Sequence, residues 1–421
     1  NVTFTYPLSK LASYKQLNNH MRSSGLLTKL RDIGHTWLWH YEVFEWLFLE
    51  RVLAESTRTS LDAIAFDKVF KRAHAEISRG SFRVRRITTL NGLPTINRPI
   101  PLSENTVLYP YNNDLPKFLN ISFQDRNRKP ILYVDPDHCL LVQNSAIRKG
   151  NGGKNLLNSQ ERLRNQASTI TKVLKLSLDT PVYPKAVYFA YLSGFPMLPI
   201  LHKEFEEFSG FLFSTNKNIS RAEITVIKKN QKLINDTLQE GRDAKFFFAL
   251  DRLSDSFRGI HEKQGIVDLI VALESLLGVR NEELKRRLAS NVAFLLGTTD
   301  SSRQAFYRHT KAGYKLRNAI VHGGENQEKA LYNALVDFYP ELQGKPVNNV
   351  LQYITKATEE LQRIVRLVIR AYLHMRDNDT RQKWPEADEL ECLALNSTRR
   401  CLIQKQLGIT SNQPSPPAYH F

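Results

Sequence analysis

The chain contains few cysteines, so it has little capacity for disulfide cross-links. Only three of its 421 residues are cysteines, namely Cys139, Cys392 and Cys401. They are too few and too scattered for a disulfide framework or a zinc knuckle. So few cysteines are typical of a reducing compartment, and we therefore expect the protein to be cytoplasmic.

Long apolar runs are also absent. No run reaches the roughly 18 residues that a membrane-spanning helix needs. The best candidate, 186–201, is interrupted by Gly194, Pro196 and Pro199, which is typical of a buried segment in a globular protein. The first residues lack the cationic and then apolar pattern of a signal peptide. We therefore expect neither a signal peptide nor a membrane contact.

Motifs for metal ions and nucleotides are weak. His35 and His40 flank an aromatic segment without a carboxylate or cysteine at ligand spacing, so we interpret them as core or interface residues. A tight turn explains the Asp-Pro-Asp-His segment 135–138 better than a metal site does. The Gly-rich segment 148–154 could contact phosphates through backbone NH groups, but it has no Walker-type ending. We expect no metal ion and no cofactor.

Positive charge is abundant. The chain has 59 Lys and Arg against 42 Asp and Glu, which gives a formal net charge of +17. This excess predicts an anionic partner such as nucleic acid, although a solvated basic surface is the alternative. The hydrophobic content of 42% allows a sizeable core, and the length suggests roughly two or three domains.

The first 160 residues are predicted to form a helical and β-rich region. Residues 7–80 have a helical composition. Short β-type runs separated by turn residues then predict a β-rich module over 81–147; the runs are 82–88, 106–109, 118–123, 131–134 and 139–142. The basic, Gly-rich segment 148–160 is predicted to be a flexible linker.

The rest of the chain is predicted to be mainly helical. A mixed α/β connecting region, 161–243, contains expected helices at 161–178 and 220–239. Apolar residues at spacings of three and four then predict a helical bundle over 244–400; its expected helices are 247–257, 266–277, 284–296, 306–321, 327–338 and 347–376. The proline-containing segment 401–421 is predicted to be a flexible tail. The expected fold class is α+β.

The segment 315–324 carries the strongest chemical motif. Arg317 keeps its charge at any physiological pH and can hold a phosphate. His322 is suited to proton transfer near neutral pH. Asn318 adds an amide, and Gly323-Gly324 is predicted to end the helix. These groups are the minimum that RNA cleavage without a metal ion requires.

Glu274 lies within an apolar helical stripe, where a carboxylate is costly unless it meets a cation. Arg317 is the cation that the motif offers. We therefore expect Glu274 to hold Arg317 or to lie near it as an orienting acid. The alternative is an ion pair that locks the bundle and takes no part in chemistry.

The spacing of Arg317 and His322 has a geometric consequence. Five residues on a regular helix place two side chains about 140° apart. One chain could still bring them together if the last helical turn relaxes. Two copies that meet at this helix are the more natural solution, because they form a two-fold cleft with two Arg and two His.

Each group in the segment has an expected role in such a cleft. His322 would act as general base on a ribose 2′-OH or as general acid on the leaving 5′-oxygen. Arg317 would stabilise the pentacoordinate phosphate, and Asn318 would bind phosphate or position His322. Three further residues are candidates for lining an RNA path, namely Lys315, Tyr314 and His309.

Three sequence blocks, 267–277, 283–289 and 316–324, together resemble the Apea-like branch of the HEPN superfamily. That family carries an Arg, usually followed by a polar residue, and a His four to six residues beyond. Arg317, Asn318 and His322 match this pattern, and the resemblance covers roughly 244–378. It implies a helical bundle, usually a homodimer, that cleaves RNA without metal and leaves a 2′,3′-cyclic phosphate.

The resemblance further implies a role in prokaryotic antiviral defence or as a toxin, with an N-terminal region that senses a trigger or selects a target. The leading hypothesis is a cytoplasmic endoribonuclease. The alternative is a non-catalytic HEPN module for dimerisation or partner binding. A third hypothesis, DNA binding through the basic surface, lacks a helix-turn-helix or zinc signature.

Overall fold

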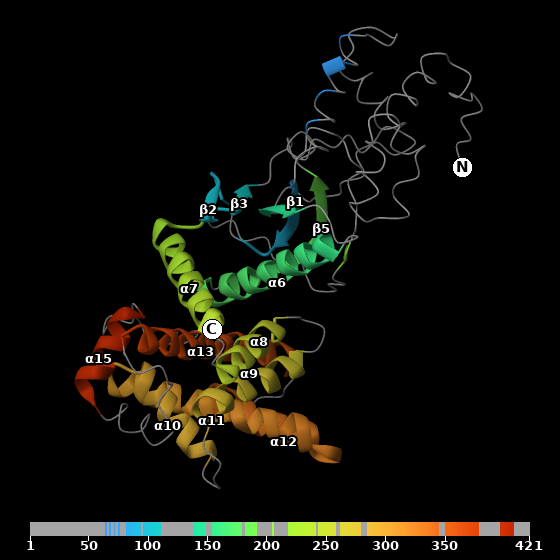
Figure 1. The fold of residues 1–421 in the computed structure, drawn as a ribbon. Helices are drawn as coiled ribbons and strands as arrows, with labels where there is room; N and C mark the ends of the chain where they lie inside the picture. The colour runs from blue at the N-terminus through green and yellow to red at the C-terminus, as the bar shows by residue number, and fades with distance from the viewer. Residues whose placement is uncertain are drawn as a thin grey trace. The chain divides into compact units, whose positions relative to one another are not determined.

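The structure is a computed structural model of the 421-residue chain (Figure 1). It describes residues 81–93, 96–110, 139–148, 154–178, 182–191, 204–205, 218–240, 243–257, 262–278, 284–344, 350–378 and 396–407, together with a few isolated positions between 64 and 75. Most of the predicted helical segment 7–80, including His35 and His40, lies outside the described residues. So does the turn at 135–138.

The chain divides into two compact units. The first comprises residues 1–91, 95–168 and 184–206, and the second comprises 92–94, 169–183 and 207–421. Helix α6 (Lys154–Ser177) begins in the first unit and continues into the second. The described residues combine many helices with one small sheet, so the α+β class is confirmed.

The sheet has six strands in the order β2-β3-β4-β1-β5-β6. Their bounds are β1 Ser81–Asn91, β2 Ile100–Ser103, β3 Thr106–Pro110, β4 Cys139–Arg148, β5 Tyr183–Tyr191 and β6 Glu204–Phe205. The central strands β1 and β4 are antiparallel, with Ile87 opposite Val142. Both residues are buried, because the alternation of the strands directs their side chains into the core.

Three of the predicted β-type runs are confirmed. They are 82–88, 106–109 and 139–142, which fall in β1, β3 and β4. The runs 118–123 and 131–134 lie outside the described residues. Strand β2 was not predicted, because its sequence Ile-Pro-Leu-Ser is short and contains a proline.

The predicted flexible linker 148–160 is partly wrong. Arg148 is the last residue of β4, and helix α6 has already begun at Lys154. Gln143 of the sheet donates a hydrogen bond to Gln166 of α6 at 3.3 Å, and Arg162 donates one to Ser145. These contacts tie the helix to the sheet, so a domain boundary at 160 would fall inside a helix.

The helical elements of the second unit agree with most of the predicted segments. Their bounds are α7 Arg221–Glu240, α8 Ala244–Asp255, α9 Glu262–Leu277, α10 Leu284–Leu296, α11 Asp300–His322, α12 Gln327–Phe338 and α13 Val350–Asn378. Helix α11 begins six residues earlier than predicted. Helix α7 starts with a capping box, since Ser220 and Glu223 exchange side-chain and backbone hydrogen bonds.

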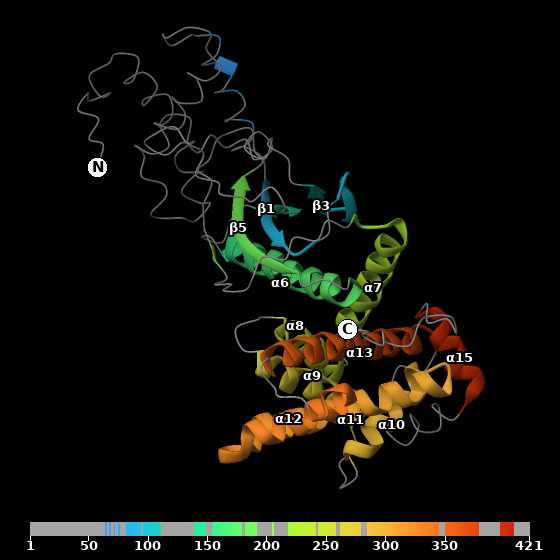
Figure 2. The same cartoon turned by 180° about the vertical axis from the view of Figure 1, so that it is seen from behind.

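Helix α9 lies at the centre of this bundle, in contact with α8, α11 and α13 (Figure 2). Its buried side chains cover most of its circumference, and five of them are fully inaccessible: Ile266, Leu269, Ile270, Ala272 and Leu273. A helix that is apolar around most of its surface must be enclosed by its neighbours. Glu274 sits on this helix, at a half-buried position.

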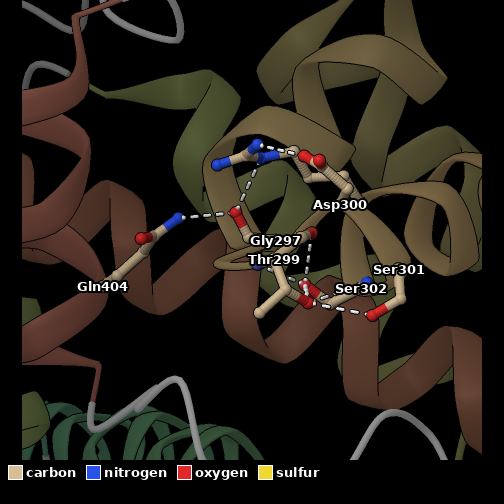
Figure 3. Close-up of polar contacts among 7 residues, drawn as sticks. Gly297, Thr299, Asp300, Ser301, Ser302 and Gln404 are labelled. Carbon is tan, nitrogen blue, oxygen red and sulfur yellow. Dashed lines mark hydrogen bonds and ion pairs between the residues drawn. The ribbon is translucent and has the colours of Figure 1, made fainter.

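The predicted flexible tail 401–421 is wrong over its first residues. Helix α15 (Ser397–Gln406) continues past 400 and packs on α10 and α13. Ile403 and Leu407 are buried. The buried Gln404 amide donates to the backbone carbonyls of Leu295 at 3.3 Å and Gly297 at 3.1 Å, the latter drawn in Figure 3. Prolines begin only at 414, beyond the described residues.

Among the helices in the described ranges, none combines the length and the apolar character that a membrane crossing requires.

Candidate functional site

Helix α11 carries every predicted site residue except Glu274. It begins at a capping box in which the Thr299 hydroxyl accepts from the Ser302 backbone NH and the Ser302 hydroxyl accepts from the Thr299 NH (Figure 3). Arg303 closes the turn before it by donating to the Gly297 carbonyl at 3.2 Å. The start of the helix is therefore fixed by local polar contacts.

One face of α11 is buried from Phe306 to Ala319. Its buried residues are Phe306, His309, Thr310, Ala312, Gly313, Leu316 and Ala319. The opposite face is open to solvent, and His322 lies on it in an exposed position. Arg317 and Tyr314 flank the buried face and are half-buried. The helix thus separates a structural side from an accessible side.

Arg317 lies close to Glu274. Burial raises the pKa of the Glu274 carboxyl, and the positive charge of Arg317 together with a hydrogen bond from the Tyr314 hydroxyl offsets part of that rise. The pKa of Tyr314 is also raised, first by burial and then by the Glu274 charge. The structure therefore brings Glu274, Tyr314 and Arg317 together where α9 meets α11.

Asn318 forms a hydrogen bond with Arg317. The Nη1 of Arg317 donates to the Oδ1 of Asn318 at 3.0 Å. The Nε of Arg317 is buried and has no hydrogen-bond partner among the described residues. Asn318 stands one turn before His322 on the solvent side of the helix. It therefore connects the anchored guanidinium to the face on which His322 lies.

His322 is the last residue of α11, and its backbone is still helical. Its side chain makes no hydrogen bond or ion pair with any other residue in the described part of the chain. The predicted end of the helix at Gly323-Gly324 is confirmed. Gly324 has a φ of +47°, which favours glycine, and a Cβ on Gly323 would lie 2.8 Å from the Cα of Gln327.

Gln327 stabilises this end of the helix. Its amide donates to the backbone carbonyls of Ile320 at 3.1 Å and Ala319 at 3.4 Å. These carbonyls belong to the last turn, where no NH group of the helix can reach them. Because of this cap the last turn does not relax, and His322 keeps the position that regular helical geometry dictates.

The regular geometry of α11 keeps Arg317 and His322 apart. Ideal helical parameters place their Cα atoms about 8–9 Å apart and their side chains about 140° apart around the axis. The last turn is helical through His322, so it does not show the relaxation that a site within one copy was expected to use, and the two-copy site stays the prediction. One copy presents the histidine to solvent and holds the arginine beside Glu274.

The three predicted RNA-path residues have different surroundings. Lys315 is 42% exposed and forms an ion pair with Asp337 of α12. Tyr314 is tied to Glu274. His309 does not lie on a path: its side chain is only 8% exposed, its Nδ1 is 3.3 Å from Oε1 of Glu360, and its ring stacks on Phe338. The prediction for His309 ignored helical phase, which puts it opposite His322.

Sequence reasoning missed several residues that shape the site. Gln327 caps the helix, and Asp337 forms an ion pair with Lys315. Burial lowers the pKa of Lys285 on α10, and the positive charges of Lys315 and Lys311 lower it further. Lys285 therefore lies near both of these side chains. Residues three and four positions apart, counted back along α11 from His322, lie on the same solvent-exposed face. This count would have identified Lys311. The partners from α10 and α12 carry no sequence signal, because only packing of the bundle brings them close.

The arrangement offers a fixed cation and an accessible imidazole on one helix. An arginine can stabilise a phosphoryl group, and an imidazole can accept or donate a proton. Within the described ranges, no three His, Cys, Asp or Glu side chains gather closely enough to hold a metal ion.

Comparisons of the chain with protein-family models, with curated proteins and with solved structures found no match. The resemblance to HEPN proteins therefore stays a prediction from the residues and their spacing.

Proposed function

We propose that the chain is a metal-independent endoribonuclease of the HEPN type. The observation that carries the proposal is the placement of two groups on α11: Arg317 lies near Glu274 and donates a hydrogen bond to Asn318, while His322 is exposed on the solvent side. The net charge of +17 adds attraction for RNA. The proposed chemistry is attack of a ribose 2′-OH on the adjacent phosphate, leaving a 2′,3′-cyclic phosphate.

In the proposed reaction each group has one task. His322 either removes the proton from the 2′-OH, while water protonates the departing 5′-oxygen, or protonates that oxygen, while water takes the proton of the 2′-OH. Arg317 stabilises the negative charge that grows on the phosphate. Because one copy holds these two groups on different sides of a helix, the site is formed by two copies, with Arg317 of one facing His322 of the other.

The biological setting belongs to the same proposal. A ribonuclease of this type serves as a cytoplasmic effector in prokaryotic antiviral defence or as a toxin. The region before the bundle then binds a trigger or selects the target.

The second candidate function is a non-catalytic dimerisation or partner-binding module. The half-buried state of Arg317, its proximity to Glu274 and its hydrogen bond to Asn318 favour this candidate, because such interactions also stabilise a bundle. It predicts that Arg317 and His322 matter for assembly and have no effect on RNA.

The test is RNA cleavage by the purified full chain in EDTA. We expect cleavage with cyclic phosphate ends, reduced about 10²–10⁴-fold by His322→Ala and about 10²–10³-fold by Arg317→Ala. Asn333→Ala, an exposed position on α12, serves as the control and should cleave like the parent. Parent-level cleavage by both folded variants would exclude this site, and loss of the dimer without any cleavage by the parent would favour the second function.

A further inference from the structure

The solvent face of α11 is basic over most of its length. Gln304, Arg308 and Lys311 are exposed, Lys315 and Asn318 are half-exposed, and His322 ends the row. The spacings of four, three, four, three and four residues place all of these side chains on one side of the helix. The row therefore has three cations before it reaches His322.

Helix α10 adds a fourth cation to this face. Burial lowers the pKa of Lys285, and the positive charges of Lys315 and Lys311 lower it further. The Lys285 ammonium group therefore lies within electrostatic reach of the other two. Asp337 opposes this effect and forms an ion pair with Lys315. One carboxylate does not neutralise a group of Lys285, Arg308, Lys311 and Lys315.

Apart from the Lys315–Asp337 ion pair and the contact of Lys311 with Tyr307, this row of like charges does not stabilise the helix. Cations three and four residues apart on a helix repel each other and weaken it. The Lys311 ammonium lies 5.7 Å from the centre of the Tyr307 ring, which limits where that ammonium can be. A row of cations that repel each other on the accessible face is suited to an anion that extends along the helix.

We propose that Arg308, Lys311, Lys315 and Lys285 form a phosphate-binding track that holds single-stranded RNA along α11 and leads it to His322. The inference rests on the proposed ribonuclease function. From Arg308 to His322 the track is about 21 Å long at 1.5 Å per residue, which accommodates several consecutive phosphates.

The single-stranded form follows from the geometry of the chemistry. Attack by a 2′-OH requires its oxygen, the phosphorus and the leaving oxygen to come into line, which needs rotation of the backbone. A paired A-form helix restricts that rotation, whereas an unpaired strand allows it. A narrow row of cations on one helix also matches one strand better than two.

The test separates binding from cleavage. The probe is a fluorescent single-stranded RNA oligonucleotide with 2′-O-methyl riboses, which cannot be cleaved through the 2′-OH. Its affinity for the full chain is measured by anisotropy across a series of salt concentrations. The variant is Arg308→Ala/Lys311→Ala/Lys285→Ala, and the control is Lys245→Ala/Lys405→Ala, two exposed cations on α8 and α15.

Each phosphate contact contributes about 0.7 to the slope of log affinity against log salt for a single strand. Loss of three contacts should therefore lower the slope by about 2, while the control should keep the slope of the parent to within half a unit. If the triple variant does not fold by circular dichroism, Lys311→Ala alone should lower the slope by about 0.7.

The experiment can refute the phosphate-binding track and the ribonuclease function independently of each other. Track-dependent binding without any cleavage of ordinary RNA would leave the track standing and refute the ribonuclease. If the parent cleaves RNA but the triple variant binds the probe with the same affinity and salt slope as the parent, the track is refuted. Tighter, track-dependent binding of duplex DNA than of single-stranded RNA would overturn RNA as the ligand.

Discussion

Two glutamates in the bundle lie near cations, but their pKa values are shifted in opposite directions. Glu274 is half-buried near Arg317, and burial dominates, so its pKa is raised. Burial also acts on Glu360, but hydrogen bonds from Arg363 and His309 outweigh it, so its pKa is lowered. Arg363 contacts both oxygens of Glu360, at 2.6 and 2.8 Å. The number of hydrogen bonds to the carboxylate therefore decides the sign of the shift.

The raised pKa of Glu274 predicts an effect of pH on stability. A carboxyl whose pKa is higher in the folded than in the unfolded state binds more protons when folded, so its contribution falls as pH rises through the folded pKa. Glu274→Gln should therefore equal or exceed the parent in free energy of unfolding at pH 7. The difference should shrink at pH values below the pKa of Glu274. Urea unfolding between pH 4 and 8 measures it.

Glu360→Gln is the matched comparison and should behave in the opposite way. A lowered pKa gives stability that is present above the unfolded value and is lost as pH falls through the folded one. Removing this charge leaves Arg363 and His309 without their carboxylate, at a cost of about 3–5 kcal/mol at pH 7. Equal behaviour of the two variants across the pH range would contradict the assigned causes.

Some of these residue contacts could be predicted from the sequence, and others could not. The proximity of Glu274 and Arg317 could be predicted, because a carboxylate in an apolar stripe needs a cation. The pairing of His309 with Glu360 could not, because 51 residues separate them and only the packing of α11 on α13 joins them. Local motifs reveal chemistry, whereas partners from distant helices depend on the tertiary fold.

At the scale of elements, α11 packs closely on two neighbouring helices at Gly313. A Cβ at this position would lie 2.8 Å from Cδ2 of Leu361 on α13 and 3.2 Å from Cδ1 of Ile270 on α9. Both neighbours are fully buried. The absence of a side chain at 313 thus allows α11 to approach two helices at once.

Gly313→Ala should therefore destabilise the bundle in spite of the better helix propensity of alanine. Overpacking of about 1–3 kcal/mol outweighs a propensity gain of up to about 1 kcal/mol. Gln304→Ala, on the solvent face of the same helix, should change stability little. The double variant Gly313→Ala/Leu361→Ala should lose less than the sum of the two single variants, because the smaller side chain removes the clash. Strict additivity would refute this contact.

The elements also show where periodicity succeeds and where it fails. Helices α10 and α12 begin and end where the apolar spacing predicts. The start of α11 was missed because its first turns, from Asp300 to Gln304, are polar and depend on the Thr299 cap. Helix α15 was missed because its buried contacts are few and one of them is an amide, Gln404. Elements that are held by polar contacts leave little apolar signal.

At the scale of the whole molecule, we propose that one copy holds half of each site. Arg317 and His322 are on different sides of a helix whose last turn is fixed by Gln327. A shared site then makes dimerisation a condition of activity. The prediction concerns which copy supplies which group, and it can be tested with dimers built from two different chains.

The most direct measurement is the RNA cleavage rate of two purified heterodimers, each isolated through two different tags. The first joins a His322→Ala copy to an Arg317→Ala copy, and the second joins a parent copy to a copy with both substitutions. Shared sites predict about half of the parent rate for the first heterodimer, which keeps one intact Arg–His pair, and almost none for the second. The reverse, an inactive first and a half-active second heterodimer, would contradict the account.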